Sequence, residues 1–495
     1  MDENQYKKLC DNCDRILLEG PASSERIALA WLHVIRAHPV FLARYERLFV
    51  RPFKSALEWL GWRRVVKEVL RIFRQQLRAL RHDFSKRACA PISADILFVS
   101  HLVNTKGTGD FYFGSLPEEF AAIGKHVVVA LIDHSTVTSP HMRILSDEKD
   151  SNLTRLVLPN TLCLRDELAM LSSMMTLSKK LVRIPEQDNL CANVRYAAAG
   201  EAISSATFQS LRIAKQIEYL IQRLRPRTLI VTFEGHAWER VAFQLARKRR
   251  TAINCVGYQH AALFRLQHSI RRNLGNGADP DNIWASGDIS AALLEKEKSL
   301  AGVKISTVGS VRVTTGCASI NKPREISGGI FTCLVLPEGL KTECNILFEF
   351  SLKCAAVYTN ATFIWRLHPI INFESLSKEN PSLRRLPKNI ILSNSSIQDD
   401  IMKSNCALYR GSTAIIQVAL AGVVPVYVRR NNEMSIDPLH GADLGVVRLS
   451  VPTELMKGVD SACARDNSVA IQNYCKNLFN PMKSAIEILD LLEKT

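Results

Sequence analysis

From residue 95 onwards the chain alternates short apolar runs with amphipathic segments, and this alternation most strongly constrains its fold. The run "DILFVSHLV" has no helical period and predicts a buried strand. "GSLPEEFAAIG" predicts a helix ending at Gly124, and "KHVVVALIDH" predicts a second strand. Because strands that alternate with helices form parallel sheets covered on both faces, we predict an α/β protein.

The same alternation occurs on both sides of a polar stretch, residues 313–328, whose Gly and Pro residues predict a linker. Runs such as "RTLIVTFEG" precede this stretch, and runs such as "IFTCLVLPEG" and "TFIWRLHP" follow it. The sequence therefore predicts two Rossmann-like domains, residues 95–312 and 329–450, with C-terminal helices over 451–495.

Residues 1–90 predict a basic helical extension. "SSERIALAWLHVIRAH" begins with a Ser cap at position 23 or 24 and predicts one helix. Farther along, apolar residues recur at spacings of three and four, and arginines and lysines fill much of the remaining surface. Such a helix suits a membrane surface, and the alternative is a helix packed on its own protein with a solvated charged face. The apolar residues are Trp59, Trp62, Val66, Val69, Phe73, Leu77 and Leu80.

The composition is that of a globular protein, with 47% hydrophobic and 23% charged residues and a net charge of +16. No apolar stretch is long enough for a membrane span, and the charged first residues do not fit a signal peptide. We therefore predict a cytoplasmic protein. Basic surface attracts polyanions, whether nucleic acid, anionic lipid or a phosphorylated substrate, and the charge alone does not choose among them.

Polar residues follow a predicted strand in "TFEGHAWER". Glu234 is the first charged residue after the apolar run 228–233, and Gly235 permits a tight turn. A carboxylate at this place can act as a general base. The alternative is a carboxylate that only complements the dipole of the next helix.

Two further strand ends lie in the second predicted domain. In "IWRLHPI", Pro369 should end a strand and leave Arg366 and His368 at its mouth. Such a pair can stabilise a phosphate and protonate a leaving oxygen, unless the histidine merely bonds the backbone. In "YRGSTAIIQVAL", Gly411 ends a strand, and Ser412-Thr413 predict either an anion site at a helix N-terminus or a plain N-cap.

These motifs, on two Rossmann-like domains with a helical tail, resemble the GT-B fold of nucleotide-sugar glycosyltransferases, whose domains face a cleft. Bacterial sialyltransferases and Kdo transferases use CMP-activated sugars and share a three-part pattern. That pattern is similar to Glu234-Gly235, His368-Pro369 and Ser412-Thr413 here. "DILFVSHLVN" and "RGSTAIIQVALAGVVPVYV" also resemble glycosyltransferases that build capsule and lipopolysaccharide.

The resemblance implies that Glu234 takes the proton of the acceptor hydroxyl. It implies that His368 contacts the CMP phosphate, which Ser412 and Thr413 also bind, and that no metal cofactor is needed. Gln417 stands where many GT-B enzymes carry a ribose-binding Glu, and Phe233 where many sialyltransferases carry a second acid. The acceptor side would consist of Gly235, His236, Tyr258, Gln259 and His260.

We therefore expect an inverting, metal-independent glycosyltransferase that moves a Kdo- or sialic-acid-like sugar from a CMP donor to a surface glycan or glycolipid. The basic N-terminal helices would hold it at the inner face of the plasma membrane. One alternative is a UDP- or GDP-sugar donor, and another is a sugar-nucleotide epimerase, which needs no acceptor. A non-catalytic basic module that binds nucleic acid is the third, but the chain has no RRM, KH or zinc-finger signature, so we expect no nucleic-acid partner.

Overall fold

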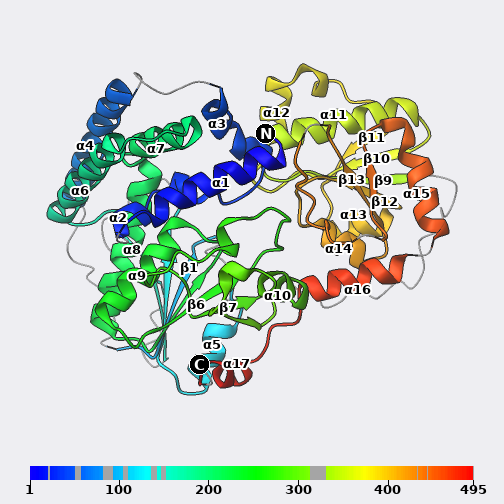
Figure 1. The fold of residues 1–495 in the computed structure, drawn as a ribbon. Helices are drawn as coiled ribbons and strands as arrows, with labels where there is room; N and C mark the ends of the chain where they lie inside the picture. The colour runs from blue at the N-terminus through cyan, green and yellow to red at the C-terminus, as the bar shows by residue number, and fades with distance from the viewer. Residues whose placement is uncertain are drawn as a thin grey trace.

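The structure is a computed structural model that describes residues 1–20, 23–50, 57–81, 93–103, 110–134, 142–145, 152–312, 331–431, 433–442, 444–465 and 467–493. Figure 1 shows two lobes, each built around one sheet. The predicted linker, residues 313–328, lies outside the described ranges.

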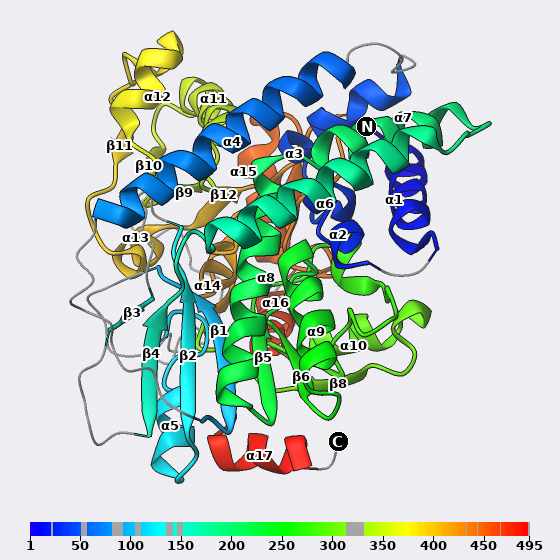
Figure 2. The same cartoon turned by 90° about the vertical axis from the view of Figure 1, so that its left-hand side faces the viewer.

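The first sheet has eight strands in the order β3-β4-β2-β1-β5-β6-β7-β8 (Figure 2). Every neighbouring pair is parallel except β3 and β4. The chain winds outwards in both directions from β1, so the strand order reverses between β1 and β5, where ligands bind in open α/β sheets. The strands are β1 (Ile96–His101), β2 (Val127–Ile132), β3 (Arg143–Ile144), β4 (Leu153–Val157), β5 (Thr228–Thr232), β6 (Asn254–Gln259), β7 (Asn282–Ala285) and β8 (Lys304–Thr307).

The second sheet has six strands in the order β11-β10-β9-β12-β13-β14, all parallel. Numbered within the domain, this is the 3-2-1-4-5-6 order of Rossmann folds, and its reversal falls between β9 and β12. The strands are β9 (Thr332–Leu336), β10 (Thr362–Trp365), β11 (Ile390–Leu392), β12 (Cys406–Tyr409), β13 (Val424–Val428) and β14 (Val447–Leu449).

Helices cover both faces of each sheet because successive strand residues point to opposite sides. In β1, Leu97 and Val99 pack into one hydrophobic cluster, and Phe98 packs into another on the opposite face. In β9, Cys333 and Leu334 divide between two clusters in the same way. The first domain contains α5 (Leu116–Ala122), α6 (Leu164–Arg183), α7 (Asn189–Glu201), α8 (Ser205–Leu224), α9 (Ala237–Arg249) and α10 (Asp288–Glu295). The second contains α11 (Lys341–Val357), α12 (Phe373–Glu379), α13 (Ile397–Lys403), α14 (Ile415–Leu420) and α15 (Leu455–Ala464).

The described residues of the predicted N-terminal extension, residues 1–90, are helical and pack on the first sheet. Leu9, Ile16 and Leu32 are fully buried in the same hydrophobic cluster as Leu97 and Val231 of the first sheet. This layer is therefore part of the first domain. It contains α1 (Glu3–Leu18), α2 (Ser24–Ile27), η1 (Ala30–His33), α3 (Pro39–Glu46), η2 (Arg47–Phe49) and α4 (Leu57–Arg81).

The single helix predicted from "SSERIALAWLHVIRAH" is wrong beyond its start. Ser23 caps α2 as predicted, but α2 ends at Ile27, and a 3-10 turn follows. Val34 then adopts a left-handed conformation with φ of 43°, which ends helical structure. Buried His33 accepts a hydrogen bond from Arg272 at 2.9 Å, so a tertiary contact overrides the local helical pattern.

The C-terminal helices return the chain to the first domain (Figure 1). The helix α16 (Ser468–Leu478) contacts both α14 of the second domain and α10 of the first, and α17 (Ala485–Glu493) packs on α5. In the stretch "KISTVGSVR", residues Lys304–Thr307 form β8 at the edge of the first sheet. None of the described helices is long and apolar enough to span a bilayer.

Candidate active site

A cavity of about 550 Å³ lies where the carboxyl ends of the two sheets face each other. Glu234, two residues after β5, and His368, three residues after β10, both line it. Two side chains 134 positions apart in the sequence (368 minus 234) therefore share one cavity, as the predicted cleft requires. Its lining residues are Arg36, His101, Val103, Tyr112, His134, Thr232, Glu234, His236, Glu239, His260, Ala261, Phe264, Arg312, Glu338, Gly339, His368, Gly411, Ser412, Thr413 and Ala414.

The carboxylate of Glu234 is held by a cation from the N-terminal layer. One nitrogen of Arg36 donates to both carboxylate oxygens at 3.1 Å, and the Glu234 side chain is only 12% exposed. Burial opposes ionisation, but the Arg36 guanidinium and the nearby His236 hold the pKa of Glu234 well below its usual range. Glu234 is thus ionised at neutral pH, and the same interaction lowers its basicity.

The turn that carries Glu234 is held by a second carboxylate. Glu239, in the first turn of α9, accepts backbone N–H bonds from Glu234 at 3.1 Å and from Gly235 and His236 at 2.8 Å. Burial raises the pKa of Glu239 to about 7. Gly235 has φ of +85°, and a Cβ atom there would lie 2.5 Å from the backbone of Ser269, so only glycine fits this turn.

Histidines of the first domain form the wall of the cavity next to Glu234. His101 Nδ1 lies 2.7 Å from His134 Nε2, and His101 Nε2 lies 3.2 Å from the Thr232 hydroxyl. Burial and the neighbouring His134 lower the pKa of His101 to about 3, and burial lowers the pKa of His260 to about 4. Neutral imidazoles can both donate and accept hydrogen bonds, which suits a sugar rich in hydroxyl groups.

His236 differs from these histidines because its ring lies beside the anionic Glu234. Its Nε2 atom is 3.4 Å from a Glu234 carboxylate oxygen. Burial opposes protonation of His236, but the hydrogen bond to Glu234 outweighs it and raises the pKa of the ring. Glu234 and His236 therefore form a pair of acid–base groups at the carboxyl end of β5.

On the opposite wall, Ser412 and Thr413 lie in the turn between β12 and α14. The helix begins only at Ile415, and its N-cap residue is Ala414, so the predicted capping role of the two hydroxyl residues is wrong. Gly411 permits close packing, since a Cβ atom there would lie 2.7 Å from a Glu338 carboxylate oxygen. Burial lowers the pKa of His368, which leaves its ring neutral at neutral pH.

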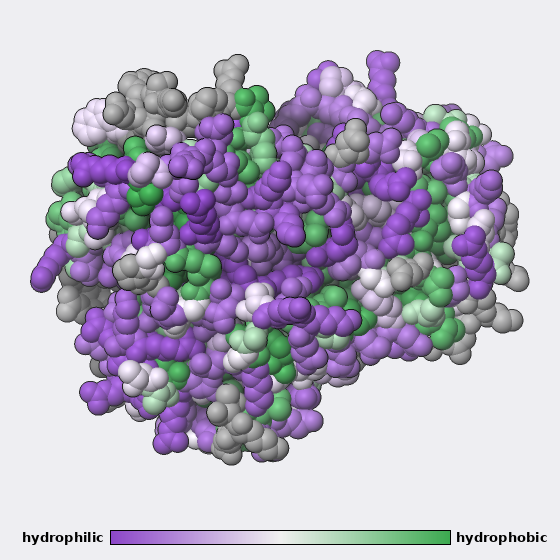
Figure 3. Space-filling view, in the orientation of Figure 1, coloured by the Kyte–Doolittle hydropathy of each residue, from purple (hydrophilic) through white to green (hydrophobic). Residues whose placement is uncertain are grey.

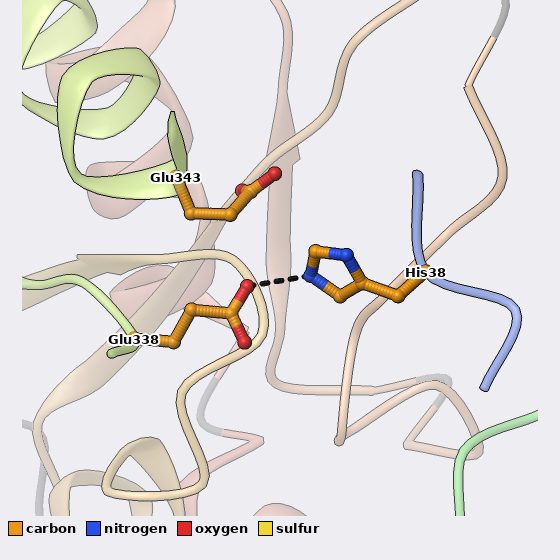
Figure 4. A group of neighbouring side chains, drawn as sticks. All are labelled: His38, Glu338 and Glu343. Atoms are coloured by element: carbon orange, nitrogen blue, oxygen red, sulfur yellow. Dashed lines mark hydrogen bonds and ion pairs between the residues drawn. The ribbon is translucent and has the colours of Figure 1, made fainter. Parts of the chain in front are cut away.

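The N-terminal segment also contacts the second domain. His38 Nε2 lies 2.7 Å from a carboxylate oxygen of Glu338, which follows β9 (Figure 4). Glu343 points towards the same place from α11, and one ligand atom of each of the three residues lies within 4.8 Å of the others. Arg410 already donates to Glu343 at 2.6 Å, so we interpret the group as an ion-pair network between the N-terminal layer and the second domain.

A second cavity of about 740 Å³ adjoins the first along α14. Gln417 lines it, and the buried Oε1 atom of this side chain has no hydrogen-bond partner among the described residues. Four residues line both cavities, namely Arg312, His368, Thr413 and Ala414. The two cavities therefore meet beside the His368 and Ser412-Thr413 motifs.

Several residues predicted for the site do not line either cavity. Arg366 donates to Asp400 at 2.9 Å and to the Ser395 carbonyl at 2.7 Å, so its guanidinium holds the β11–α13 connection. Tyr258 is buried in the core and donates to the Gly309 carbonyl at 3.0 Å. The remaining three are Gly235, Gln259 and Pro369. Gln259 is buried and accepts from the Ser286 backbone at 3.1 Å.

The sequence analysis did not predict five residues that lie in or beside the cavity, namely Arg36, His38, His101, Arg312 and Glu338. Two of them carried a usable signal. Glu338-Gly339 follows its strand at the same distance as Glu234-Gly235 follows β5, and His101 is the last residue of β1. The other three lie in segments whose sequence shows no strand end, and only the tertiary structure brings them to the cleft.

Hydrophilic side chains dominate the face on which the two lobes meet in Figure 3.

No family model and no curated protein matches the chain. Solved structures with a similar arrangement include the glycotransferase of kitacinnamycin, at 12% identity, covering 82% of this chain and 99% of that chain, with a TM-score of 0.46. Another is the lipopolysaccharide outer core galactosyltransferase WaaB, at 11% identity, 81% and 99% coverage and a TM-score of 0.46. A third is UDP-GlcNAc 2-epimerase from Methanocaldococcus jannaschii, at 12% identity, 81% and 99% coverage and a TM-score of 0.42.

The two sheets themselves define the class of fold. Each has a parallel Rossmann-like core with a reversal of strand order, and the cavity lies between their carboxyl ends. The predicted fold class, α/β with two Rossmann-like domains facing a cleft in the GT-B manner, is confirmed. The helical N-terminal layer completes the first of these domains.

Proposed function

We propose that the protein is an inverting glycosyltransferase that moves a sugar from a nucleotide-sugar donor to a glycan or glycolipid acceptor. One observation above all supports this proposal. A carboxylate of the first domain and an imidazole with two hydroxyl residues of the second domain line one cavity between them. The transfer needs these two sets of groups on opposite sides of the anomeric carbon.

In the proposed reaction, the acceptor oxygen forms a bond to the anomeric carbon as the bond from that carbon to the phosphate oxygen breaks. The proton of the acceptor hydroxyl passes to Glu234, which is ionised at neutral pH. The nucleotide leaves with the electron pair of the broken bond. His368, Ser412 and Thr413 would donate hydrogen bonds to its phosphate, so the transfer needs no metal cofactor.

For the donor, we propose a CMP-sugar with a Kdo- or sialic-acid-like sugar. The support is the three-part motif, whose members Glu234, His368 and Ser412-Thr413 meet in one cavity. Gln417 lines the adjoining cavity with an unpartnered amide oxygen, which can accept a hydrogen bond from a ribose hydroxyl. UDP- and GDP-sugars are the alternatives, because an amide at this position does not distinguish among the bases.

Donor hydrolysis and transfer test this proposal directly. The full chain should release CMP from CMP-Kdo or CMP-sialic acid, and hydrolysis of only UDP- or GDP-sugars would replace the CMP donor by the alternative. Glu234→Gln should abolish transfer and leave nucleotide affinity nearly unchanged, because Glu234 lies on the acceptor side. Interconversion of a sugar nucleotide without any acceptor would instead indicate an epimerase.

We also propose that α4 holds the enzyme at the inner face of the plasma membrane. This helix lies on the outer side of the N-terminal layer (Figure 2), with Ile72 buried against the protein. A neighbouring stripe of the helix is apolar and exposed, with exposed fractions of 65% for Trp62, 51% for Phe73 and 56% for Leu77. The exposed cations Lys67 and Arg74 lie beside it, which is the pattern of an interfacial helix on anionic lipid.

Vesicle binding tests the membrane proposal. The full chain should co-sediment with phosphatidylglycerol vesicles, and Trp62→Ser with Phe73→Ser should lose this binding while the melting temperature stays the same. Ile486→Ser is the matched control because Ile486 is equally exposed, at 63%, but lies on α17. Undiminished sedimentation of the double variant would contradict a docking role for α4.

A further inference from the structure

We propose that Arg312 is the cation that binds the phosphate of the nucleotide-sugar donor. This inference rests on the proposed function. It gives to Arg312 a role that the sequence analysis had given to Arg366. Arg366 was expected to have this role, but its guanidinium is engaged by Asp400 at 2.9 Å outside both cavities.

Arg312 lies at the junction of the two cavities. Arg312 lines both the cavity that holds Glu234 and the adjoining cavity that holds Gln417. The other residues that line both cavities are His368, Thr413 and Ala414, and the first two of these were predicted to contact the phosphate. In a nucleotide sugar the phosphate lies between the nucleoside and the sugar, so it belongs at the junction of the two cavities.

The backbone before Arg312 is held in place from two sides. After β8, Val308 donates to the Ala285 carbonyl at 3.0 Å, and Tyr258 donates its hydroxyl to the Gly309 carbonyl at 3.0 Å. On the other side, Ser310 donates to the Asn480 carbonyl at 2.8 Å, which belongs to the segment between α16 and α17. A guanidinium that starts from a fixed backbone loses less freedom when it binds a ligand.

The guanidinium of Arg312 is available to bind an anion. Two nearby arginines already bond carboxylates. Arg36 donates to Glu234 at 3.1 Å, and Arg410 donates to Glu343 and to Glu433 at 2.6 Å each. Among the residues that the structure describes, the Arg312 side chain has no ion pair or hydrogen bond, and its residue is half-buried. Arginine presents a planar fork of donors that matches a phosphate.

The two sides of the proposed phosphate site belong to different domains. Arg312 lies five residues after β8, the edge strand of the first sheet, whereas Ser412 and Thr413 follow β12 of the second. A bound phosphate would therefore bridge the domains, and donor binding would stabilise their closed arrangement.

Calorimetric titration of the full chain tests the inference. We would titrate wild type and Arg312→Gln with CMP, UDP and GDP, and with the corresponding nucleosides. For the nucleotide that wild type binds most tightly, the variant should lose about tenfold to a hundredfold in affinity, as expected when a charged hydrogen-bonded partner is removed. Affinity for the nucleoside should not change, because the nucleoside has no phosphate.

Two further variants make the result specific. Arg312→Lys keeps the charge without the planar fork of donors and should bind the nucleotide with intermediate affinity. This variant also tests the inference if Arg312→Gln does not fold. Arg429→Gln removes an exposed arginine that lines neither cavity and should bind like wild type.

The outcomes separate the inference from the proposed function. If Arg312→Gln binds the nucleotide as tightly as wild type, or loses nucleoside affinity equally, the role of Arg312 is refuted and the transferase proposal stands. If wild type binds none of the nucleotides, the proposed function fails, and the phosphate site fails with it.

Discussion

The ionisation of Glu234 depends on Arg36, a side chain 198 positions earlier in the chain. The sequence around Glu234 predicts a carboxylate after a strand, but it contains no information about the cation beside it. Burial alone would raise the pKa of this carboxyl group, but Arg36 and His236 lie next to it and hold that pKa below its usual range. The chemistry of the residue is thus set by a tertiary contact.

Replacing Arg36 by Gln should therefore move the pH dependence of transfer. A general base acts only when deprotonated, so the rate falls as the pH drops through its pKa. Without the Arg36 charge, burial raises the pKa of Glu234, and the acidic limb of kcat/KM should shift upwards by about one to three pH units. Arg36→Lys keeps the charge and should retain the wild-type limb. Identical profiles for wild type and Arg36→Gln would show that Glu234 is not the base.

Arg366 allows a second prediction at this scale. Its partner Asp400 is only 2% exposed, so Arg366→Gln leaves a buried carboxylate without its cation. The free energy of unfolding should fall by about 1–3 kcal/mol, measured by denaturant unfolding. Nucleotide affinity should stay unchanged because the side chain lines neither cavity. Weaker nucleotide binding by a folded Arg366→Gln variant would show that Arg366 contributes to the phosphate site.

At the scale of elements, the turns after the strands position the site, and they were largely predictable. The strands β1, β5, β9, β10 and β12 lie where apolar runs predicted them. The predicted turn at Gly235 is present, and Glu239 holds it by accepting the backbone N–H groups of residues 234–236. The prediction of one helix over 23–38 is wrong because buried contacts, rather than local preferences, determine the conformation of that segment.

A pair of glycine variants tests how closely the Glu234 turn is constrained. Gly235 and Gly124 have similar φ angles, +85° and +82°, but a Cβ atom meets the Ser269 backbone at 2.5 Å at the first site and nothing within 4 Å at the second. Gly124→Ala should cost about 1–2 kcal/mol of backbone strain. Gly235→Ala should cost about 1–3 kcal/mol more because of overpacking, and should lower the transfer rate. Equal losses of stability would contradict this account of the turn.

At the scale of the whole molecule, both ends of the chain cross between the domains. The N-terminal segment bonds Glu234 of one domain through Arg36 and Glu338 of the other through His38. The C-terminal helix α17 buries Ile488 in the hydrophobic cluster of the first domain, beside Phe113 and Phe120. Neither connection follows from the local pattern of these helices, because an amphipathic helix does not indicate which surface its apolar side will meet.

This arrangement predicts that a C-terminal substitution destabilises the first domain. Ile488→Ala should lower the free energy of unfolding by about 2–5 kcal/mol, since Ile488 is fully buried. Ile486 lies on the same helix but is 63% exposed, so Ile486→Ala should change stability by less than about 0.5 kcal/mol. Tryptophan fluorescence during denaturant unfolding would measure both variants. A similar effect of the two would mean that α17 does not complete the core.

The pattern of apolar runs was enough to predict the two α/β domains and the residues that follow their strands. Hydrophobic periodicity is a local property, and parallel strands bring their carboxyl ends to one edge. Three features required the folded chain, namely that Arg36 stabilises the ionised form of Glu234, that Arg366 bonds Asp400, and that Arg312 lies where the two cavities meet. The physical reason is that charge pairing and burial depend on distances in space between side chains, and these side chains come from segments far apart in the chain.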